Sequence, residues 1–537
     1  MPDGFNTAAE GAAFAARTLE RDARPKLLIM PHDPDLTADA IRDALRRSGT
    51  VYERGVLVRL ALDRMQGGVV AQPLTPESVM REVHRMTRPV RLNAKKDGTS
   101  EEVPAALPRV LALAYLDMRG EWDVPALNGI ASAPLLHADG TIHAVDGYDT
   151  ATGMFCENVP DVQHLVPEAP TKEQAAAALL RIRTAWRTFP FKDAAKVVDP
   201  ALKVSVVDVR QNPRKDETAF LCGLLTAVCR PSLHTAPGLL LHAPAMSGAG
   251  TGKGLLARTI ACIAFGRSPH AVTQGGTSEE LEKRISSELI EGAPVLFLDN
   301  FNGVALKSDT LASAITERPA RTRLLGKSQM VPLNATAFIV VTGNGLTVSE
   351  DLARRFIAAE LDADMEDPEQ RPFRGDLLAE MREHRAGLLA ACLTIWRWGR
   401  QNVASLVHGK PLGSFGQWCE WVRDPLLTLG CTDPAERVSE AKAKDERRQV
   451  VGDLLAAWFE HHHDLAVRAA DLHQDVKAIL DPQGRGRQFI AAALGKMSGT
   501  RVAGFVLTEQ RPVGKWGATT YAVAQVKPEQ PAWEATV

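Results

Sequence analysis

The sequence predicts an α/β fold in which a mostly parallel sheet is flanked by helices, with an α+β region before it and a small helical unit after it. Between about residues 201 and 400, short apolar runs typical of buried strands alternate with helical segments, and this alternation produces parallel strands. A glycine-rich stretch directly follows one of these strands and leads into a helix. After residue 446, three helical segments precede a β-ribbon, and this order predicts a separate small unit after the sheet.

Composition limits the class of protein. The 537 residues are 45% hydrophobic and 24% charged, which is typical of a soluble globular protein of about three domains. The formal net charge of −2 argues against a chain coated in nucleic acid, so any DNA contact must come from local basic patches. The seven cysteines are scattered singly, which argues against a disulfide framework or a structural zinc site and fits a reducing compartment.

The chain shows neither of the patterns that direct a protein to a membrane. No apolar run reaches the roughly 20 residues that cross a bilayer, and the N-terminus lacks a basic region followed by an apolar core. We therefore expect a cytoplasmic protein without membrane contact.

Residues 1–200 are expected to form a mixed α+β N-terminal domain. Residues 35–49 have helical periodicity, with Thr37 placed to cap the helix, and residues 50–62 have the pattern of two strands joined by a turn. Thr171 is expected to cap a further helix that leads toward the central domain.

Residues 201–400 are expected to form the central domain. Thr277 and Glu280 have the spacing of a capping box at the start of one of its helices. The expected strands cover residues 238–243, 293–300 and 335–344, and the expected helices cover residues 252–266 and 277–292.

Residues 401–445 read as a helical connector, and residues 446–537 read as a winged-helix-like domain. In such a domain the third helix enters a DNA groove and the hairpin forms the wing. The side chains expected to face phosphates are Arg485, Arg487, Lys496 and Lys515. Winged helices also dock proteins, so the sequence leaves both roles open.

The run of histidines at 461–463 invites a metal interpretation. Adjacent residues of a helix point in different directions, so these three rings cannot converge on one ion. We therefore expect no metal at this run.

The stretch "HAPAMSGAGTGKGLLAR", residues 242–258, resembles a phosphate-binding loop but departs from G-x-x-x-x-G-K-[ST] twice. Ser247 replaces the first glycine, and Gly254 replaces the hydroxyl residue that holds magnesium. A loop between a buried strand and a helix N-terminus directs backbone N–H groups at an anion, and Lys253 would reach the β- and γ-phosphates. The expected nucleotide-binding residues are Gly248, Ala249, Gly250, Thr251, Gly252, Lys253 and Gly254. The alternative is an ordinary flexible loop.

Two later strands end in polar residues suited to the same site. Asp299 follows the apolar run "VLFL" and would bind Mg²⁺, because ligands of open α/β sheets bind at the carboxyl ends of the strands. Asn300 follows it and could orient an attacking water but cannot accept its proton. Asn344 ends the run "FIVVTG" and could hydrogen-bond a γ-phosphate. The alternative for Asp299 is an ordinary aspartate at a strand end.

The segment "SEDLARRF" places Arg354 and Arg355 on a short helix that Ser349 is expected to cap. An arginine that reaches a neighbouring subunit's γ-phosphate raises hydrolysis by roughly 10³–10⁵. The alternative is a pair of solvated surface arginines.

Together, the runs "LFLDN", "TGN" and "DLARRF" and their compact spacing resemble the superfamily 3 helicases, an AAA+-type branch of P-loop ATPases. The nearest likeness is to primase–helicases of phages, integrated elements and poxvirus-type viruses, and it covers most of residues 105–445. No primase domain is evident before residue 105, so a separate primase is a possible partner.

The resemblance implies an AAA+-like P-loop ATPase core that uses ATP and Mg²⁺. It implies a ring, expected to be a hexamer, with ATP between subunits and an arginine supplied by the neighbour. It also implies that a hairpin over residues 321–335 grips single-stranded DNA in a central pore, through Arg321, Arg323, Lys327 and Ser328. By resemblance alone, Glu282 is a candidate general base; the alternative is a surface glutamate.

These observations predict an ATP-dependent DNA helicase or translocase that replicates a phage or mobile genetic element. Two alternatives stay open. One is a nucleotide-gated DNA-binding replication initiator or loader with little turnover, which Gly254 and Asn300 favour. The other is an AAA+ protein remodeller in phage defence.

Overall fold

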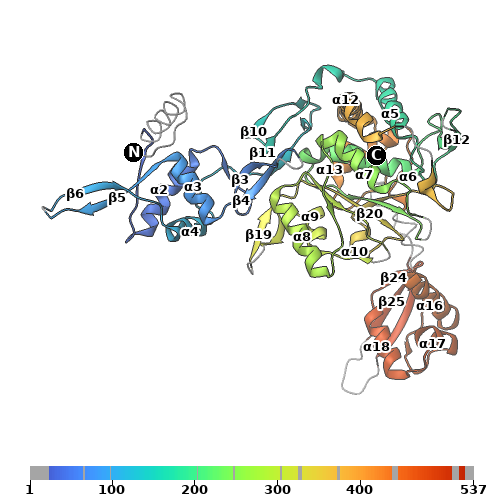
Figure 1. The fold of residues 1–537 in the computed structure, drawn as a ribbon. Helices are drawn as coiled ribbons and strands as arrows, with labels where there is room; N and C mark the ends of the chain where they lie inside the picture. The colour runs from blue at the N-terminus through green and yellow to red at the C-terminus, as the bar shows by residue number, and fades with distance from the viewer. Residues whose placement is uncertain are drawn as a thin grey trace. The chain divides into compact units, whose positions relative to one another are not determined.

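The largest sheet of the described residues has five strands, and every neighbouring pair of them runs parallel. Figure 1 labels one of its strands, β20. The strand order is β15-β16-β20-β14-β22. The strands are β14 (Gly238–Ala243), β15 (Ala271–Val272), β16 (Val295–Leu298), β20 (Phe338–Asn344) and β22 (Phe356–Glu360). The predicted mostly parallel sheet is therefore confirmed. Its strands are nearly continuous apolar runs because both faces are covered.

The computed structural model describes residues 23–63, 67–96, 98–201, 203–245, 248–302, 305–324, 329–371, 375–437, 446–510 and 519–526. The chain divides into two compact units, Met1–Ala435 and Glu436–Val537. Within the described residues, no helix has the length and apolar character to cross a membrane.

Helices cover both faces of the sheet because the chain reverses direction across it. The connection from β14 to β15 runs to one edge through α7, and the chain then returns strand by strand through α8 and α9. Crossovers between parallel strands are right-handed, so α7 lies on one face and α8 and α9 lie on the other. The helices of this region are α6 (Lys215–Cys229), α7 (Lys253–Phe265), α8 (Ser278–Glu291), α9 (Asp309–Thr316) and α10 (Glu350–Ala353).

Two smaller sheet elements accompany α9 and α10. Strands β18 (Ala320–Arg323) and β19 (Met330–Leu333) form an antiparallel hairpin. Strands β17 (Ala305–Leu306) and β21 (Thr347–Val348) pair in parallel.

The first residues form a lobe around a core of their own, which includes Ile41, Val79, Leu107 and Tyr115. Its sheets have the orders β1-β5-β6 and β2-β3-β4. The elements are β1 (Lys26–Leu28), α2 (Pro34–Arg46), β2 (Val51–Glu53), β3 (Leu57–Leu62), β4 (Val69–Pro73), α3 (Pro76–Met86), β5 (Arg88–Ala94), β6 (Ser100–Pro104) and α4 (Arg109–Asp117).

Helix α2 corrects one expectation. Asp33, not Thr37, caps α2, and its side chain accepts a hydrogen bond from the N–H of Leu36. Pro34 explains the earlier start, because a proline at the first helical position has its φ preset and lacks an N–H that would go unpaired. Thr37 is buried instead, and its hydroxyl accepts a hydrogen bond from the N–H of Met30.

Residues that follow this lobe pack into the same core as the central sheet. Thr171 caps α5 in a capping box with Gln174, as expected for this threonine. From α5, the buried Trp186 donates a hydrogen bond to Thr259 of α7. The elements are β7 (Gly129–Ala131), β8 (Leu135–Leu136), β9 (Ile142–His143), β10 (Gly147–Asp149), β11 (Met154–Cys156), α5 (Lys172–Trp186), β12 (Lys196–Val198) and β13 (Ser205–Val207).

The segment after the sheet folds back onto it. Helix α12 packs against α5, α6 and α7. Trp418, fully buried, donates a hydrogen bond to Thr226 of α6, which anchors the residues after 401 to the core. The helices are α11 (Leu377–Glu383), α12 (Arg385–Gln401), α13 (Gly416–Trp418) and α14 (Asp424–Thr428), with a π-helical stretch at Cys419–Arg423 between the last two.

The second unit has its own core, which includes Leu454, Trp458, Val476 and Leu494. Its antiparallel sheet has the order β23-β26-β25-β24. The elements are α16 (Glu446–His462), β23 (Val467–Arg468), α17 (Gln474–Leu480), α18 (Arg487–Met497), β24 (Arg501–Val502), β25 (Phe505–Gln510) and β26 (Thr520–Gln525). The three expected helices and the hairpin are present in the expected order, with a short strand between the first two helices.

One buried arginine joins the first lobe to the central domain. Arg54 follows β2, is 4% exposed, and has no carboxylate among its described hydrogen-bond partners. Burial lowers the pKa of Arg54 to about 10. Its guanidinium donates to the backbone carbonyls of Leu127, Asn128, Leu289, Ile290 and Asn334 at 2.7–3.3 Å. Two of these carbonyls belong to the last turn of α8, where helix carbonyls lack intrahelical partners.

We predict that Arg54→Met lowers the free energy of unfolding of the first unit by about 2–4 kcal/mol, because it removes a charged donor group on which these buried carbonyls converge. Thermal unfolding of the full chain followed by differential scanning calorimetry measures the effect. Arg46→Met is the matched control, since Arg46 makes an exposed ion pair with Asp123 and its loss should cost less than about 1 kcal/mol. Equal effects of the two substitutions would contradict the structural role of Arg54.

Candidate nucleotide-binding site

The glycine-rich loop joins the end of β14 to the start of α7, as the sequence predicted. Gly250 and Gly252 have φ of +72° and +92°, values that glycine adopts without strain. Helix α7 begins at Lys253, and no side chain of a described residue caps it. Its first N–H groups are therefore available to an anion. Ser247, the first departure from the motif, lies outside the described residues.

Lys253 folds back onto this loop. Its ammonium donates hydrogen bonds to the carbonyl of Gly248 at 2.6 Å and to the hydroxyl of Thr251 at 2.9 Å. The same hydroxyl donates to the carbonyl of Gly248 at 3.0 Å. Burial lowers the pKa of Lys253 to about 8, and the charge of Asp299 opposes that shift. The hydrogen-bond partners of this ammonium are uncharged oxygens, so they do not cancel its positive charge. The ammonium lies against the loop that would bind a phosphate.

Asp299 lies directly after β16 and against the first turn of α7. One of its oxygens accepts a hydrogen bond from the hydroxyl of Thr342 at 2.5 Å, and the other lies 4.0 Å from the guanidinium of Arg258. A Cβ atom on Gly254 would lie 3.7 Å from the Asp299 carboxylate. The position where a hydroxyl residue would hold magnesium therefore does face Asp299, and Gly254 leaves it without an oxygen ligand.

Asn344 ends β20 beside the glycine loop, and the register pairs it with Ala243 of β14. Its backbone N–H donates to the side-chain oxygen of Asn302 at 2.7 Å. Its own side-chain oxygen is buried without a hydrogen-bond partner in the described structure, and a Cβ atom on Gly248 would lie 2.6 Å from it. Buried polar atoms are nearly always paired, so this oxygen is available to accept a hydrogen bond from a ligand or water at the loop.

Asn300 adopts a left-handed conformation with φ of +66°. Its backbone N–H donates to Thr342, and its side-chain oxygen accepts a hydrogen bond from Asn302 at 2.6 Å. Asn302 therefore holds the side chain of Asn300 at one strand end and the backbone of Asn344 at the other. Glu282, the candidate base, accepts a hydrogen bond from the N–H of Thr310 in the first turn of α9.

Lys253, Asp299 and Asn344 are thus brought together at one edge of the sheet. Sequence reasoning missed Thr342 and Arg258, which contact Asp299. Thr342 could have been found because it lies two residues before Asn344, and alternate residues of a strand share a face. Arg258 gave no signal, since its position follows only from the packing of α7 on β16.

Arg354 and Arg355 lie just after α10, and both form ion pairs with Asp351. The side chain of Arg354 is 60% exposed and that of Arg355 only 16%. Arg354 is therefore the better placed of the two to reach another subunit. Ser349 occupies the N-cap position of α10, but its side chain makes no capping hydrogen bond, so that expectation is wrong.

The β18–β19 hairpin presents its arginines on one face. Arg321 and Arg323 are exposed and alternate with the buried Ala320 and Thr322. Lys327 and Ser328, expected at the tip, lie outside the described residues.

In the second unit, Arg485, Arg487 and Lys496 are all exposed. Arg485 lies before α18, with its guanidinium over the ring of Phe489 at 4.5 Å. Arg487 and Lys496 are nine positions apart in α18, which is half a turn out of phase at about 100° per residue. The helix therefore does not present these two residues on a common face. Lys515 lies outside the described residues.

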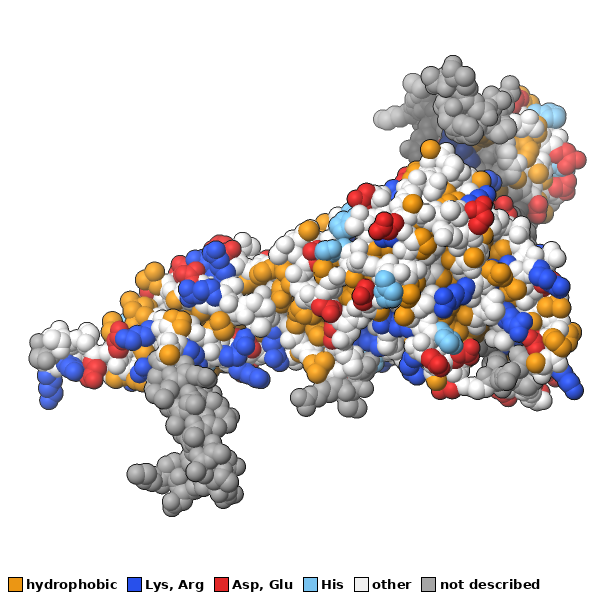
Figure 2. All heavy atoms as spheres, turned by 90° about the horizontal axis from the view of Figure 1, so that it is seen from above, with side chains coloured by type: hydrophobic (Ala, Val, Ile, Leu, Met, Phe, Trp, Pro, Cys, Tyr) orange, Lys and Arg blue, Asp and Glu red, His pale blue; other side chains and the backbone are white. Residues whose placement is uncertain are grey.

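Figure 2 shows Lys and Arg side chains dispersed among Asp and Glu over the visible face of the described residues. This distribution agrees with the near-neutral net charge. Any contact with a nucleic acid backbone would depend on local elements such as the hairpin.

No protein-family model matches the chain, and neither does any curated protein. Among solved structures, the apo A form of the NrS-1 C-terminal region is 12% identical, covers 90% of this chain and 98% of its own, and has a TM-score of 0.39. The structure described as an active SCCmec type IV Cch helicase is 10% identical, covers 90% of this chain and 97% of its own, and has a TM-score of 0.27.

A JCV helicase bound to a small molecule is 15% identical, covers 42% of this chain and 55% of its own, and has a TM-score of 0.22. Two of these three structures are described as helicases. The three TM-scores are below 0.5, so these likenesses carry no weight for function, which is inferred below from the site.

The lowered pKa of Lys253 predicts how nucleotide affinity depends on pH. In the free protein Lys253 loses its proton as the pH rises through about 8, whereas a bound triphosphate would favour the protonated form and raise its pKa. Affinity for a fluorescent ATP analogue should be flat below pH 8 and fall by up to about tenfold per pH unit above it.

Fluorescence anisotropy between pH 7 and 9.5 measures this profile. Lys253→Arg should flatten it, because a guanidinium stays charged throughout this range. Lys283→Arg, an exposed position of α8, should leave it unchanged. A falling profile that persists in Lys253→Arg would assign the titration to another group.

Proposed function

We propose that this protein is an ATP-dependent DNA helicase or translocase that acts as a ring and serves the replication of a phage or mobile genetic element. The observation that carries the proposal is the convergence of the glycine loop, Lys253, Asp299 and Asn344 at one edge of a parallel sheet. Each group offers what a triphosphate needs. The loop offers N–H donors, Lys253 offers positive charge, and Asp299 offers oxygen ligands for a cation.

The residues present fit ATP with Mg²⁺, since Asn344 has an unpaired buried oxygen at the loop and Asp299 adjoins the helix that would hold the phosphates. Bound Mg²⁺ would neutralise part of the negative charge of the phosphates. Lys253 would leave Gly248 and Thr251 to contact the β- and γ-phosphates. Asn344 would orient the γ-phosphate or its attacking water, and Asn300 would border that water.

The ring proposal rests on the arginines. Arg354 is exposed, and its described ion pair is with Asp351, on its own turn. In a ring it would contact the γ-phosphate bound to the adjoining subunit and stabilise the charge that develops during hydrolysis. From the resemblance to superfamily 3 helicases, we propose that this ring is a hexamer, with a separate primase as a possible partner.

The DNA proposal rests on the hairpin. Arg321 and Arg323 share its exposed face, and contacts to phosphates, unlike contacts to base edges, suit a motor that must move along any sequence. We propose that these hairpins, together with Lys327 and Ser328, hold one DNA strand in a central pore. We further propose that the second unit is a winged helix that contributes Arg485, Arg487, Lys496 and Lys515 to DNA binding.

A second candidate function is a nucleotide-gated DNA-binding initiator or loader with little turnover. Gly254 favours it because the position that faces Asp299 has no hydroxyl. Asn300 favours it because an amide held by Asn302 cannot accept a proton from water.

We predict that single-stranded DNA raises the ATPase rate of the full chain, and that Lys253→Ala abolishes turnover because it removes the charge that holds the phosphates. Arg321→Ala with Arg323→Ala should keep basal turnover and lose the stimulation. A coupled-enzyme ATPase assay measures both, and Arg46→Met with Arg109→Met is a matched exposed control. Negligible turnover with ATP-dependent DNA binding would support the initiator, and turnover indifferent to DNA would reject both candidates.

The ring is tested by mixing inactive variants. Arg354→Ala and Lys253→Ala should each be inactive alone and regain part of the activity when mixed, because a mixed ring has some interfaces with an intact Lys253 and an intact Arg354. Analytical ultracentrifugation checks that the variants still assemble. No recovery in assembled mixtures would show that Arg354 does not act across a subunit interface.

We predict that Gly254→Ser lowers the Mg²⁺ concentration for half-maximal ATPase activity by roughly threefold to tenfold, since it adds an oxygen ligand beside Asp299. The new Cβ would lie in ordinary contact with that carboxylate at 3.7 Å, so the substitution fits. A Mg²⁺ titration of ATPase activity measures the change, with Gly254→Ala as the control that adds only the carbon. Equal curves for the serine and alanine variants would show that position 254 does not face the cation.

A further inference from the structure

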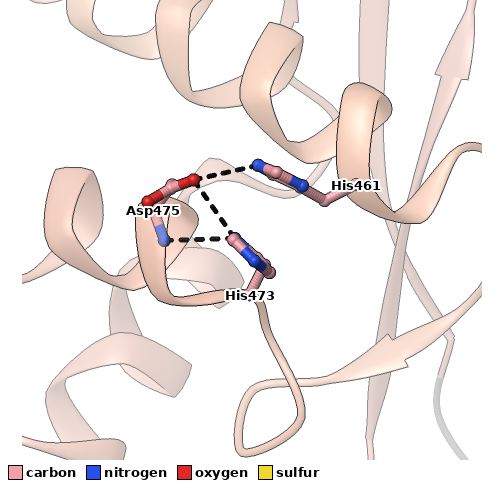
Figure 3. A group of neighbouring side chains, drawn as sticks. All are labelled: His461, His473 and Asp475. Atoms are coloured by element: carbon pink, nitrogen blue, oxygen red, sulfur yellow. Dashed lines mark hydrogen bonds and ion pairs between the residues drawn. The ribbon is translucent and has the colours of Figure 1, made fainter.

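Three potential metal-ligating side chains come together in the second unit (Figure 3). His461 comes from the last turn of α16, His473 occupies the N-cap of α17, and Asp475 lies in the first turn of α17. Their ligating atoms all lie within 4.8 Å of one another, and all three residues are exposed. An ion from solvent therefore has direct access to them.

The spacing of these atoms suits a shared cation. Nε2 of His461 lies 3.1 Å from one Asp475 oxygen, and Nδ1 of His473 lies 3.3 Å from the same oxygen. Two ligands bound to Zn²⁺ at 2.0–2.1 Å with tetrahedral angles are separated by roughly 3.3 Å. Small side-chain rotations would place a cation between the three ligands.

The arrangement of the two rings, the carboxylate and the end of α16 also favours a cation. The rings of His461 and His473 stack with centroids 3.7 Å apart and an angle of 19° between planes. Nε2 of His461 and Nδ1 of His473 both face the Asp475 carboxylate, and Nδ1 of His473 also accepts the long cap hydrogen bond from the N–H of Asp475 at 3.4 Å. Because imidazole lone pairs lie in the ring plane, rotation of the rings out of their stack would direct both nitrogens at a cation on the carboxylate side and would replace that cap bond. The C-terminal end of α16 also carries partial negative charge, which favours a cation there.

Neighbouring residues fix this arrangement. His462 accepts a hydrogen bond from the N–H of His473 at 2.9 Å and packs against Trp458, while His463 packs against Phe459. The three consecutive histidines thus point to three different sets of neighbours, in agreement with the argument that they cannot bind one ion together. His461 instead finds its partners in α17, and His462 holds the backbone of His473 in place.

We propose that His461, His473 and Asp475 bind one divalent transition-metal ion, in the first place Zn²⁺, with water completing the coordination. Imidazole and carboxylate ligands suit Zn²⁺. Mg²⁺ and Ca²⁺ prefer oxygen ligands, so these side chains should bind them more weakly. The ion cross-links the end of α16 to the start of α17 through two histidines that are twelve positions apart. It thereby stabilises the folded second unit.

Isothermal titration of the full chain with ZnCl₂, without nucleotide, tests the proposal. The seven cysteines are buried and do not compete for added metal. One Zn²⁺ should bind per chain, and His473→Ala or His461→Ala should weaken that binding by at least about tenfold. His463→Asn is the matched control and should bind as the unchanged protein does. Asp475→Asn, which keeps hydrogen-bonding capacity, should also weaken binding.

Thermal unfolding supplies a second measurement. Saturating Zn²⁺ should raise the Tm of the second unit in the unchanged protein and in His463→Asn but not in His473→Ala. Excess Mg²⁺ should produce no such rise. Equal Zn²⁺ affinity in the unchanged protein, His461→Ala and His473→Ala would overturn the proposal. So would the absence of binding when the free Zn²⁺ concentration is about 1 mM, roughly 100 times that of the protein.

Discussion

The parallel pairing of β14, β20 and β16 is the constraint on which the candidate site depends. In this register Ala243 lies beside Asn344, and Leu298 lies beside Val341, so three connecting segments leave the sheet at the same edge. Thr342 and Asn344 are two positions apart on one strand, so the same register directs the first at Asp299 and the second at the glycine loop. A slip of one residue would reverse both side chains, which is why the buried apolar strands that fix the register also fix the chemistry.

This edge of the sheet keeps several polar groups short of partners. The side-chain oxygen of Asn344 is buried and unpaired, burial depresses the pKa of Lys253, and the first turn of α7 has no side-chain cap in the described structure. The unpaired oxygen of Asn344 opposes folding by roughly 1–3 kcal/mol. A chain of phosphates would accept hydrogen bonds from Lys253 and from the first turn of α7, and a water beside the last phosphate would donate one to the oxygen of Asn344. The folded site therefore has the character of a preorganised receptor for a phosphate chain and its water.

The parts of the fold that local patterns determine could be predicted from the sequence. These parts are short-range features, since each depends on an apolar run and on the turn or capping residues that bound it. They include the strand before the glycine loop, the helix after it, and the strands that end at Leu298 and Asn344. Errors arose where a neighbour outside the pattern decided the outcome, as when Pro34 moved the start of α2 and made Asp33 its cap. Contacts between distant segments gave no sequence signal. Arg54 on the carbonyls of α8 and His461 beside Asp475 both depend on packing that no local periodicity encodes.

The order of elements places the hairpin in the chain between two residues of the site. The β18–β19 hairpin follows Asp299 after β17 and α9, and it leads into the start of β20, the strand that ends at Asn344. Its base is braced from the other side, because Arg54 donates to the carbonyl of Asn334, just after β19, and to the last turn of α8. A Cβ atom on Gly55 would overlap the carbonyl of Pro332, which shows how closely the first lobe approaches β19. The base of the hairpin is therefore held against the first lobe, and Arg321 and Arg323 extend from a supported position.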